Sequence, residues 1–126
     1  MWAQPLQTQS FLKWLLYQVN SSLNSNFNGI LVNRYETGEN YISAHSDNEN
    51  YLDSNNKMVA TISYGATRKF RIRNKQTKQI VLDYPLETGT LLIMQGEFQS
   101  EFTHEIPKEL TIHNPRISIT FRRHNF

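Results

Sequence analysis

The segment "ISAHSDNEN" (42–50) places a histidine and an aspartate one residue apart. Side chains alternate with a period of two in extended backbone, so His45 and Asp47 would point to the same side and could bind one metal ion. The alternative is two polar residues on a surface loop. Because the sequence contains no cysteine, it excludes disulfides, thiolate nucleophiles and cysteine-based zinc sites. A catalytic metal would therefore need a third ligand that is a histidine or a carboxylate.

Three further histidines are candidates for the third ligand, and spacing alone does not choose among them. His104 lies at the end of a predicted strand, where it can reach the opening of a barrel from the opposite sheet. His113 lies in the turn before Pro115, and His124 is close to the last residue. Two histidines and one carboxylate form the facial triad of non-haem Fe(II) oxygenases, which leaves coordination positions for a co-substrate and dioxygen. Zinc with the same ligands is the competing interpretation.

Two arginines share one face of a predicted strand near the end of the sequence. Arg116 and Arg122 are six residues apart, which is about 20 Å in fully extended backbone. One could bind a distant carboxylate through two hydrogen bonds while the other lies nearer a metal. A dicarboxylic keto acid between metal and arginine would fit this layout. Two exposed cations on an edge strand are the alternative.

The elements that would position these residues follow from hydrophobic periodicity. Apolar residues recur at intervals of three and four between Ser10 and Leu23, which predicts one amphipathic helix. The segment "NSNFNG" (24–29) is rich in turn-forming residues and ends this helix. The following strands are predicted at 30–36, 40–46, 57–64, 68–73, 79–83, 90–94, 100–104 and 116–123. This order indicates a mainly β fold, a double-stranded β-helix (jelly roll) with the N-terminal helix packed on one sheet.

Alternation within the strands predicts what each face contacts. In "RISITFR" (116–122), the apolar face would pack on the helix, and the polar face would line an open cavity. Two earlier segments are predicted to present a polar face in the same way. The residues assigned to those faces are Asn33 and Tyr35 in one segment, and Tyr41, Ser43, His45 and Asp47 in the other.

Length and composition indicate one ordinary globular domain. The 126 residues, 38% hydrophobic and 19% charged, suit a single domain over 1–126, with an N-terminal helix segment at 1–28 and a jelly-roll core at 29–126. No apolar run is long enough to cross a bilayer, and no signal peptide is evident. We therefore expect an intracellular protein without a membrane partner, and we expect a monomer.

Positive charge is concentrated in a basic stripe that contains no acidic residue. Its members are Arg68, Lys69, Arg71, Arg73, Lys75 and Lys78. Such a stripe suits a nucleic-acid backbone, whereas a solvated hairpin protected from aggregation is the alternative. The formal net charge of +2 is too small to decide between them.

Six segments, taken in order, resemble the AlkB family of Fe(II)- and 2-oxoglutarate-dependent dioxygenases, especially the animal-type members that repair alkylated DNA and RNA. They are "NRY" (33–35), "HSDNE" (45–49), "ISYGATRKF" (62–70), "GTLLIMQG" (89–96), "THEIPKE" (103–109) and "NPRISITFR" (114–122). The histidine–aspartate pair alone is a weak motif. The ordered set over about ninety residues is a specific one.

The resemblance implies a role for individual residues. His45, Asp47 and His104 match the iron ligands. Arg116 matches the residue that pairs with the far carboxylate of 2-oxoglutarate, and Arg122 matches the second arginine, near the metal-chelating end. The other implied co-substrate contacts are Asn33, Tyr35 and Ser118, and the implied substrate contacts are Asn48, Glu49, Arg68, Arg71 and Arg73.

The resemblance also implies a reaction, the oxidative demethylation of N-alkylated bases such as 1-methyladenine and 3-methylcytosine in single-stranded DNA or RNA. Fe(II), 2-oxoglutarate and dioxygen would be required, and succinate, CO₂ and formaldehyde would be released. The target base must leave its stack to reach the metal, which requires stacking and phosphate contacts around the opening. The alternatives are an oxygenase acting on a protein or small molecule, and a non-catalytic nucleic-acid-binding module of the same fold.

Three departures from the family pattern bear on these expectations. Asn48 stands where an aspartate usually lies beside the target base, which removes a negative charge. Ser118 stands in place of an asparagine, which removes one hydrogen bond worth about 1 kcal/mol. Only 32 residues precede Asn33, so most of the family's N-terminal substrate lid is expected to be missing, as in a small virus- or phage-encoded enzyme or an excised core. We expect the open pocket to favour single-stranded substrates.

Overall fold

The computed structural model describes residues 6–47 and 58–124 of the chain. Its elements in chain order are α1 (Leu6–Leu23), β1 (Gly29–Tyr35), β2 (Ile42–His45), β3 (Val59–Gly65), β4 (Arg68–Asn74), β5 (Ile80–Leu86), β6 (Leu91–Met94), α2 (Phe98–Glu101), β7 (Phe102–Ile106) and β8 (Arg116–Arg122). Each of the eight predicted strands has a counterpart in the structure. The sequence prediction missed α2, because a helix of four residues is too short to show a hydrophobic period.

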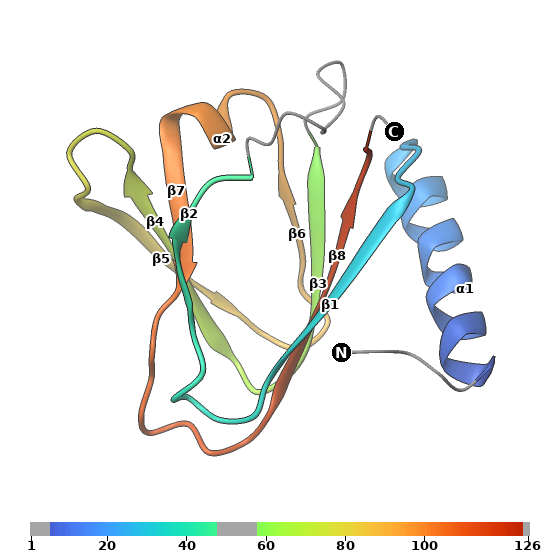
Figure 1. The fold of residues 1–126 in the computed structure, drawn as a ribbon, viewed down its shortest axis with the longest axis horizontal. Coiled ribbons are helices and arrows are strands. Elements are labelled where there is room, and N and C mark those ends of the chain that lie inside the picture. The colour runs from blue at the N-terminus through green and yellow to red at the C-terminus, as the bar shows by residue number, and fades with distance from the viewer. Residues whose placement is uncertain (1–5, 48–57, 125–126) are drawn as a thin grey trace.

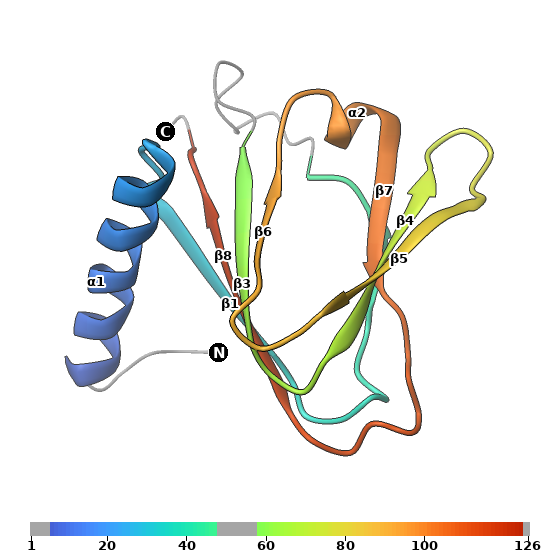
Figure 2. The same cartoon turned by 180° about the vertical axis from the view of Figure 1, so that it is seen from behind.

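The strands form two four-stranded antiparallel sheets that face each other. One sheet has the order β1-β8-β3-β6 and the other the order β2-β7-β4-β5. Successive strands such as β1 and β2 therefore lie in different sheets, which is the jelly-roll arrangement that the sequence predicted. The two sheets are closest at one end of the molecule and diverge toward the end where α2 lies (Figures 1 and 2).

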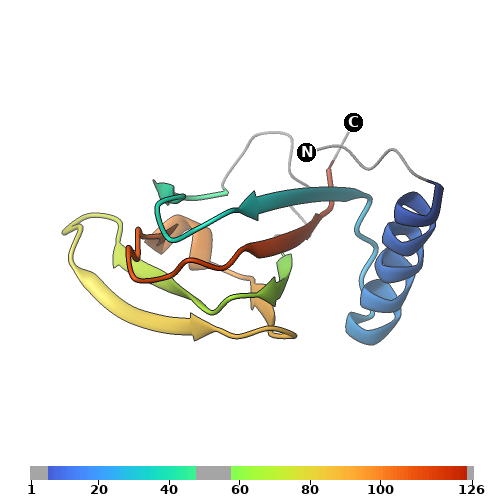
Figure 3. The ribbon, with the colours of Figure 1, turned by 90° about the horizontal axis from the view of Figure 1, so that it is seen from below.

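Helix α1 packs on the outer face of the β1-β8-β3-β6 sheet, so that three layers lie side by side (Figure 3). Leu15 and Val19 are buried against apolar side chains of β3 and β8, among them Ile119 and Phe121. Arg116, Ser118, Thr120 and Arg122 are on the opposite face of β8 and line a cavity between the sheets. This division of the two faces confirms the alternation predicted for 116–122.

Two asparagines, Asn20 and Asn24, shape the turn through which the chain leaves α1. Asn24 adopts a positive φ of 51°, a left-handed conformation that asparagine tolerates better than most residues. The Asn20 side chain accepts a hydrogen bond from the Phe27 N–H (2.7 Å) and donates one to the Phe27 carbonyl oxygen (3.2 Å). These bonds direct the chain from the helix into β1, as the turn-forming composition of 24–29 predicted.

Tyr41, Ser43, His45 and Asp47 were predicted to share one face of the second strand, and this prediction is wrong for Tyr41 and Ser43. Tyr41 and Ser43 are exposed, whereas Ile42 and His45 line the cavity. The cause is a register shift, because Ile42 pairs with Ile106 and His45 pairs with His104. Two residues on β2 therefore lie opposite one residue on β7 between these pairs. The additional residue of such a bulge reverses the alternation. His45 and Asp47 share a side as predicted.

Two connections meet at the end where the sheets converge. The Gly38 N–H donates to the Ile112 carbonyl oxygen (2.7 Å), and the Glu109 N–H donates to the Gly38 carbonyl oxygen (2.8 Å). A Cβ atom added to Gly38 would lie 1.6 Å from the Glu109 carbonyl oxygen. Only glycine permits this approach.

None of the described helices combines the length and apolar character needed to cross a membrane.

Candidate active site

Two histidines face each other across neighbouring antiparallel strands at the open end of the cavity. His45 is the last residue of β2, and its register partner on β7 is His104. Their ring centroids are 4.4 Å apart. The His104 ring also stacks on Phe70, with centroids 5.3 Å apart, so its orientation is fixed by packing as well as by the backbone. Strand pairing therefore brings together two potential metal ligands that are far apart in sequence.

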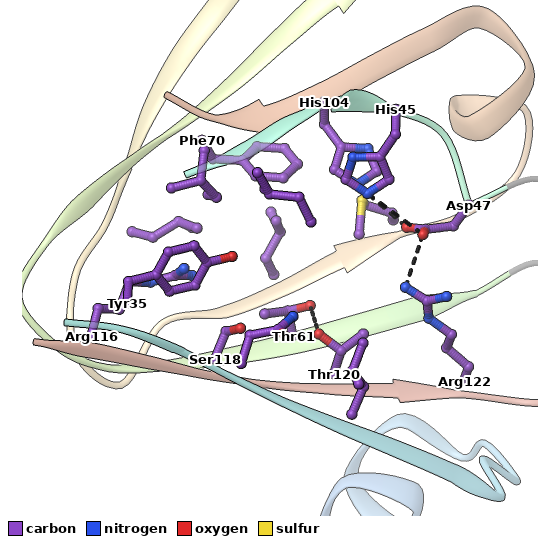
Figure 4. A pocket seen from close by; sticks show the side chains of 17 residues that line it. Tyr35, His45, Asp47, Thr61, Phe70, His104, Arg116, Ser118, Thr120 and Arg122 are labelled. Carbon is purple, nitrogen blue, oxygen red and sulfur yellow. Dashed lines mark hydrogen bonds and ion pairs between the residues drawn. The ribbon is translucent and has the colours of Figure 1, made fainter. Parts of the chain in front are cut away.

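Asp47 completes a three-residue group with these histidines. One donor atom from each of His45, Asp47 and His104 lies within 4.8 Å of the others. The Asp47 carboxylate is 3.3 Å from His104 Nε2 and 3.7 Å from His45 Nε2. Arg122 donates a hydrogen bond from Nη2 to Asp47 Oδ1 at 2.8 Å. Figure 4 shows the three side chains and Arg122 gathered at one end of the cavity.

The Asp47 carboxyl group is almost fully buried, and its neighbours keep it ionised. Burial alone would raise the pKa of Asp47, but the hydrogen bond with His104 and the positive charge of Arg122 outweigh burial, so the pKa falls below its ordinary value. A carboxylate that stays charged when buried is suited to bind a cation.

The donor set fits one first-row divalent metal. The Nδ1 atom of His45 lies 2.8 Å from the Ser43 carbonyl oxygen, which can only accept, so in the neutral ring Nδ1 carries the proton and Nε2 presents a lone pair. This is the usual arrangement behind a metal-binding histidine. Metal–ligand bonds of about 2.1 Å place two ligand atoms at most about 4.2 Å apart, which small side-chain rotations would achieve here. Two imidazoles and one carboxylate suit Fe(II), with zinc as a chemical competitor.

The cavity extends from this group toward Arg116 and has a volume of about 80 Å³. A single water occupies about 10–15 Å³ by the same measure, so side chains do not fill the interior. Thr61 and Thr120 lie between the two ends and share a hydrogen bond of 3.0 Å. Arg116 and Tyr35 lie at the end opposite the histidines (Figure 4). The other lining residues are Leu31, Asn33, Ile42, Phe70, Leu86, Leu92, Met94, Ile106 and Ser118.

Arg116 is a buried cation without a carboxylate partner in the described part of the chain. It is 2% exposed, and its Nη2 donates to Ser63 Oγ at 2.8 Å. Its Nε and Nη1 atoms have no hydrogen-bond partner among the described residues. Burial, more than any other cause, lowers the pKa of Arg116, and contact with Tyr35 opposes this shift. Arginine nevertheless stays protonated, so this end of the cavity is suited to an organic anion.

Comparison with known proteins agrees with this chemistry. Residues 4–122 match the family model of the 2OG-Fe(II) oxygenase superfamily. The chain belongs to this superfamily. Among curated 2OG-Fe(II) oxygenases, it is 37% identical over 119 residues to the alpha-ketoglutarate-dependent dioxygenase alkB homolog 3 of Bos taurus, covering 88% of this chain and 41% of the relative. It is 33% identical over 104 residues to the human DNA oxidative demethylase ALKBH2, covering 77% and 40%. The AlkB resemblance is thereby confirmed.

The fold is that of the superfamily as well. The solved structure of OsALKBH1 matches 97% of this chain and 65% of that chain with a TM-score of 0.61, at 19% sequence identity. This likeness supports the jelly-roll fold, and the low identity limits it to the fold. The chain spans about two fifths of the length of the curated relatives it matches.

Several residues predicted for this oxygenase site do line the cavity. The predicted co-substrate residues Asn33, Tyr35, Arg116, Ser118 and Arg122 are all in its wall. Arg122 is bonded to Asp47, so its position is beside the candidate metal ligands. His113 is exposed in the connection between β7 and β8. Asn48 and Glu49, the substrate contacts predicted next to the metal pair, lie outside the described residues.

The prediction that Arg68 contacts nucleic acid is wrong. Arg68 is 1% exposed, because alternation along β4 places it on the same inward face as Phe70 and Ile72. Its guanidinium donates to three carbonyl oxygens, those of Thr37 (3.2 Å), Asn40 (2.7 Å) and Pro107 (2.8 Å). Its charge centre lies 5.5 Å from the centroid of the Tyr35 ring, on which Arg116 also stacks at 5.1 Å. Arg68 therefore stabilises the closed end of the cavity through these hydrogen bonds and the contact with Tyr35.

Arg71 and Arg73 lie on the outward face of β4, but acidic neighbours partly neutralise them. Arg71 donates two hydrogen bonds to Asp83, at 2.8 and 3.0 Å. Arg73 donates to Glu105 Oε2 at 3.1 Å. The sequence did not reveal these partners, because Asp83 and Glu105 come from β5 and β7. The basic stripe is therefore less positive than its composition suggested.

Sequence reasoning missed two polar groups that support the site. Gln99 of α2 is 5% exposed, and its side-chain oxygen accepts a hydrogen bond from the Asp47 N–H at 2.8 Å. Ser63 binds Arg116. No local motif marks Gln99. Ser63 lies within the matched segment 62–70, and the alternation of β3, which puts Thr61 and Ser63 on the same face, was a further signal for it.

Proposed function

We propose that this protein is an Fe(II)- and 2-oxoglutarate-dependent dioxygenase that removes alkyl groups from N-alkylated bases in DNA or RNA. The observation that carries the proposal is the convergence of His45, Asp47 and His104 at one end of a cavity whose other end is a buried guanidinium with no carboxylate partner among the described residues. A metal-chelating dicarboxylate could bind a metal at the first end and the Arg116 guanidinium at the second. The names of the relatives, a dioxygenase and a DNA oxidative demethylase, support the choice of substrate class.

His45, Asp47 and His104 would hold the metal, and Arg116 would pair with the far carboxylate of 2-oxoglutarate. Asn33, Tyr35 and Ser118 would orient the co-substrate chain along the cavity wall. Arg122 would hold Asp47 in place through the bond to Oδ1. The apolar part of the wall, including Leu92 and Met94, would exclude water from the reacting groups.

When bound, Fe(II) supplies the coordination positions at which 2-oxoglutarate and dioxygen react. In the overall reaction, an N-methyl base, 2-oxoglutarate and O₂ give the unmethylated base, formaldehyde, succinate and CO₂. One oxygen atom enters succinate and the other enters formaldehyde. The protein residues orient the reactants and exclude water.

We further propose a single catalytic domain over 1–126 that acts as a monomer inside the cell on single-stranded nucleic acid. A flipped or unpaired base reaches a buried metal at a lower cost than a paired base does. The substrate contacts we retain are Asn48, Glu49, Arg71 and Arg73.

The test is a coupled assay with Fe(II), 2-oxoglutarate and oligonucleotides that contain 1-methyladenine or 3-methylcytosine. We expect formaldehyde and unmethylated base in equal amounts, succinate in at least that amount, and more turnover on single strands than on duplexes. The His45→Ala variant is the negative control. Succinate formation no higher than in this control would contradict the proposal.

The pairing of the basic stripe favours one alternative, an oxygenase acting on a protein or small molecule. Neutralised arginines contribute less to phosphate binding than free ones. A variant with Arg71→Gln and Arg73→Gln tests whether the basic stripe contacts nucleic acid, with Arg34→Gln as a control on β1. For a nucleic-acid substrate, the double variant should lose oligonucleotide turnover and keep substrate-independent succinate formation. Unchanged oligonucleotide turnover would remove these arginines from the contact surface.

A further inference from the structure

Among the three candidate metal ligands, Asp47 is the one that lies outside a strand. His45 and His104 are fixed by the ladder between β2 and β7, whereas Asp47 follows the end of β2 and has no strand partner. Two hydrogen bonds between a side chain and the backbone fix its segment instead. The Ser46 hydroxyl donates to the Phe102 carbonyl oxygen at 2.7 Å, and the Asp47 N–H donates to Gln99 Oε1 at 2.8 Å.

Gln99 is well placed to hold this backbone group. It lies on α2, directly before β7, and is buried to 95% (5% exposed). Because the Asp47 N–H is a donor, the amide oxygen must face it. The amide nitrogen then faces the Met94 sulfur at 3.6 Å, a weak acceptor that tolerates this orientation.

The short helix is itself anchored to the hairpin between β4 and β5. Lys75 Nζ donates to the Gln99 carbonyl oxygen at 2.8 Å, and the Lys75 N–H donates to the Glu101 carbonyl oxygen at 3.1 Å. Gln99 is therefore held by its main chain on one side and holds Asp47 by its side chain on the other. A residue fixed in this way can set the position of a neighbouring group.

We propose that Gln99 is a positioning residue, which sets the orientation of Asp47 for metal binding through the hydrogen bond to the Asp47 N–H. This inference rests on the proposed function, because it treats Asp47 as a metal ligand. Hydrogen-bonded groups behind metal ligands typically account for about 10- to 100-fold in metal affinity. Loss of the Gln99 oxygen should therefore weaken metal binding by about that factor.

The experiment titrates the whole protein with Mn(II) and measures free Mn(II) by electron paramagnetic resonance. Gln99→Met keeps the length and approximate volume of the side chain but removes the acceptor. Gln99→Glu keeps an oxygen at the same place. Gln95→Met makes the first substitution at an exposed position before α2 and serves as the matched control. Thermal unfolding without metal establishes that each variant folds.

We expect Gln99→Met to raise the Mn(II) dissociation constant by about 10- to 100-fold, and Gln99→Glu and Gln95→Met to change it by less than about threefold. A purely structural role of Gln99 predicts a different result. Gln99→Glu should then be less stable than Gln99→Met, because it buries a carboxylate. Gln99→Met should bind Mn(II) as tightly as the parent. If Gln99→Met does not fold, Gln99→Asn replaces it, since the shorter side chain cannot reach the Asp47 N–H.

Mn(II) binding by Gln99→Met as tight as by the parent would overturn the inference, as would equal weakening in the Met and Glu variants. The parent and His45→Ala are titrated in parallel. If those two bind Mn(II) equally, the proposed metal site itself fails. If only His45→Ala is weakened, the metal site stands and the role of Gln99 fails.

Discussion

At the scale of single residues, the buried charges of Asp47 and Arg116 define the two ends of the cavity. Asp47 is paired with Arg122 and contacts both histidines, whereas Arg116 has no acidic partner among the described residues. Both residues are less than 5% exposed. Burying charge without compensation is costly. A cation near Asp47 and an anion near Arg116 would relieve that cost.

The first prediction concerns stability and pH. In the metal-free protein, Asp47→Asn should lower the free energy of unfolding at pH 7 by about 1–3 kcal/mol, since it removes the negative charge that accepts the hydrogen bond from Arg122. The folded-state pKa of Asp47 is depressed, so its contribution is present above the unfolded value of about 3.9 and is lost as pH falls through the lower folded value. Urea unfolding of parent and variant between pH 7 and pH 2 should show the difference narrowing in acid. A difference independent of pH would contradict this account.

The second prediction concerns the co-substrate. Arg116→Met should raise the KM for 2-oxoglutarate at least about thirtyfold, because breaking a buried charge pair costs about 2 kcal/mol or more. Ser118→Ala removes only a neutral hydroxyl from the same wall and should change KM by about fivefold at most. Substrate-independent succinate formation at varied 2-oxoglutarate measures both. Equal KM values for Arg116→Met and the parent would exclude Arg116 as the carboxylate partner.

At the scale of elements, strand alternation explains both the successes and the errors of the sequence prediction. Alternation correctly assigned the faces of β8, and it would have assigned Arg68 to the inside of β4 with Phe70 and Ile72. A single additional residue in β2 made the predicted face wrong for Tyr41 and Ser43. Spacing along the chain did not choose His104 over His113. The family resemblance chose His104, and the structure pairs it with His45 across β7 and β2. The acidic partners of the basic stripe were hidden because spacing along the chain does not encode strand pairing.

The third prediction tests the contact that joins the β1–β2 and β7–β8 connections. Gly38→Ala would place a Cβ 1.6 Å from a backbone oxygen, so the Glu109 segment must move, at a cost of about 1–3 kcal/mol. The Cβ of Gly29→Ala meets the His124 ring instead, at 2.9 Å from Nδ1, and a side chain yields at a lower cost than a backbone carbonyl does. Denaturant unfolding should show Gly38→Ala as clearly less stable than Gly29→Ala. Equal stabilities would show that this connection is not closely packed.

The fourth prediction concerns the ion pair between β4 and β5. Asp83→Asn should cost about 0.5 kcal/mol at pH 7, because the pair with Arg71 is largely solvated although it is bidentate. The depressed pKa of Asp83 means that this contribution is present above about pH 3.9 and disappears as the folded carboxylate becomes protonated. Thermal unfolding at pH 7 and pH 2.5 measures it. A loss of unfolding free energy as large as that of Asp47→Asn would contradict the account, which expects the less buried carboxylate to contribute less.

At the scale of the whole molecule, the fold separates structural packing from chemistry. The outer face of β3 and β8 is apolar and covered by α1, while the inner face of the same two strands presents polar side chains to the cavity. A sheet with two such faces can hold charged groups in the interior without weakening the main hydrophobic core. The sequence predicted this architecture because hydrophobic periodicity is a local property. It could not predict α2 or Gln99, whose role arises only from tertiary contact.

The central claim is that one metal and one dicarboxylate share this cavity. The most direct measurement is X-ray diffraction with anomalous scattering from crystals grown with Mn(II) and 2-oxoglutarate. The account predicts a single anomalous peak about 2.0–2.2 Å from His45, Asp47 and His104, and a carboxylate of 2-oxoglutarate against Arg116. A peak elsewhere, or a dicarboxylate that does not reach Arg116, would contradict it.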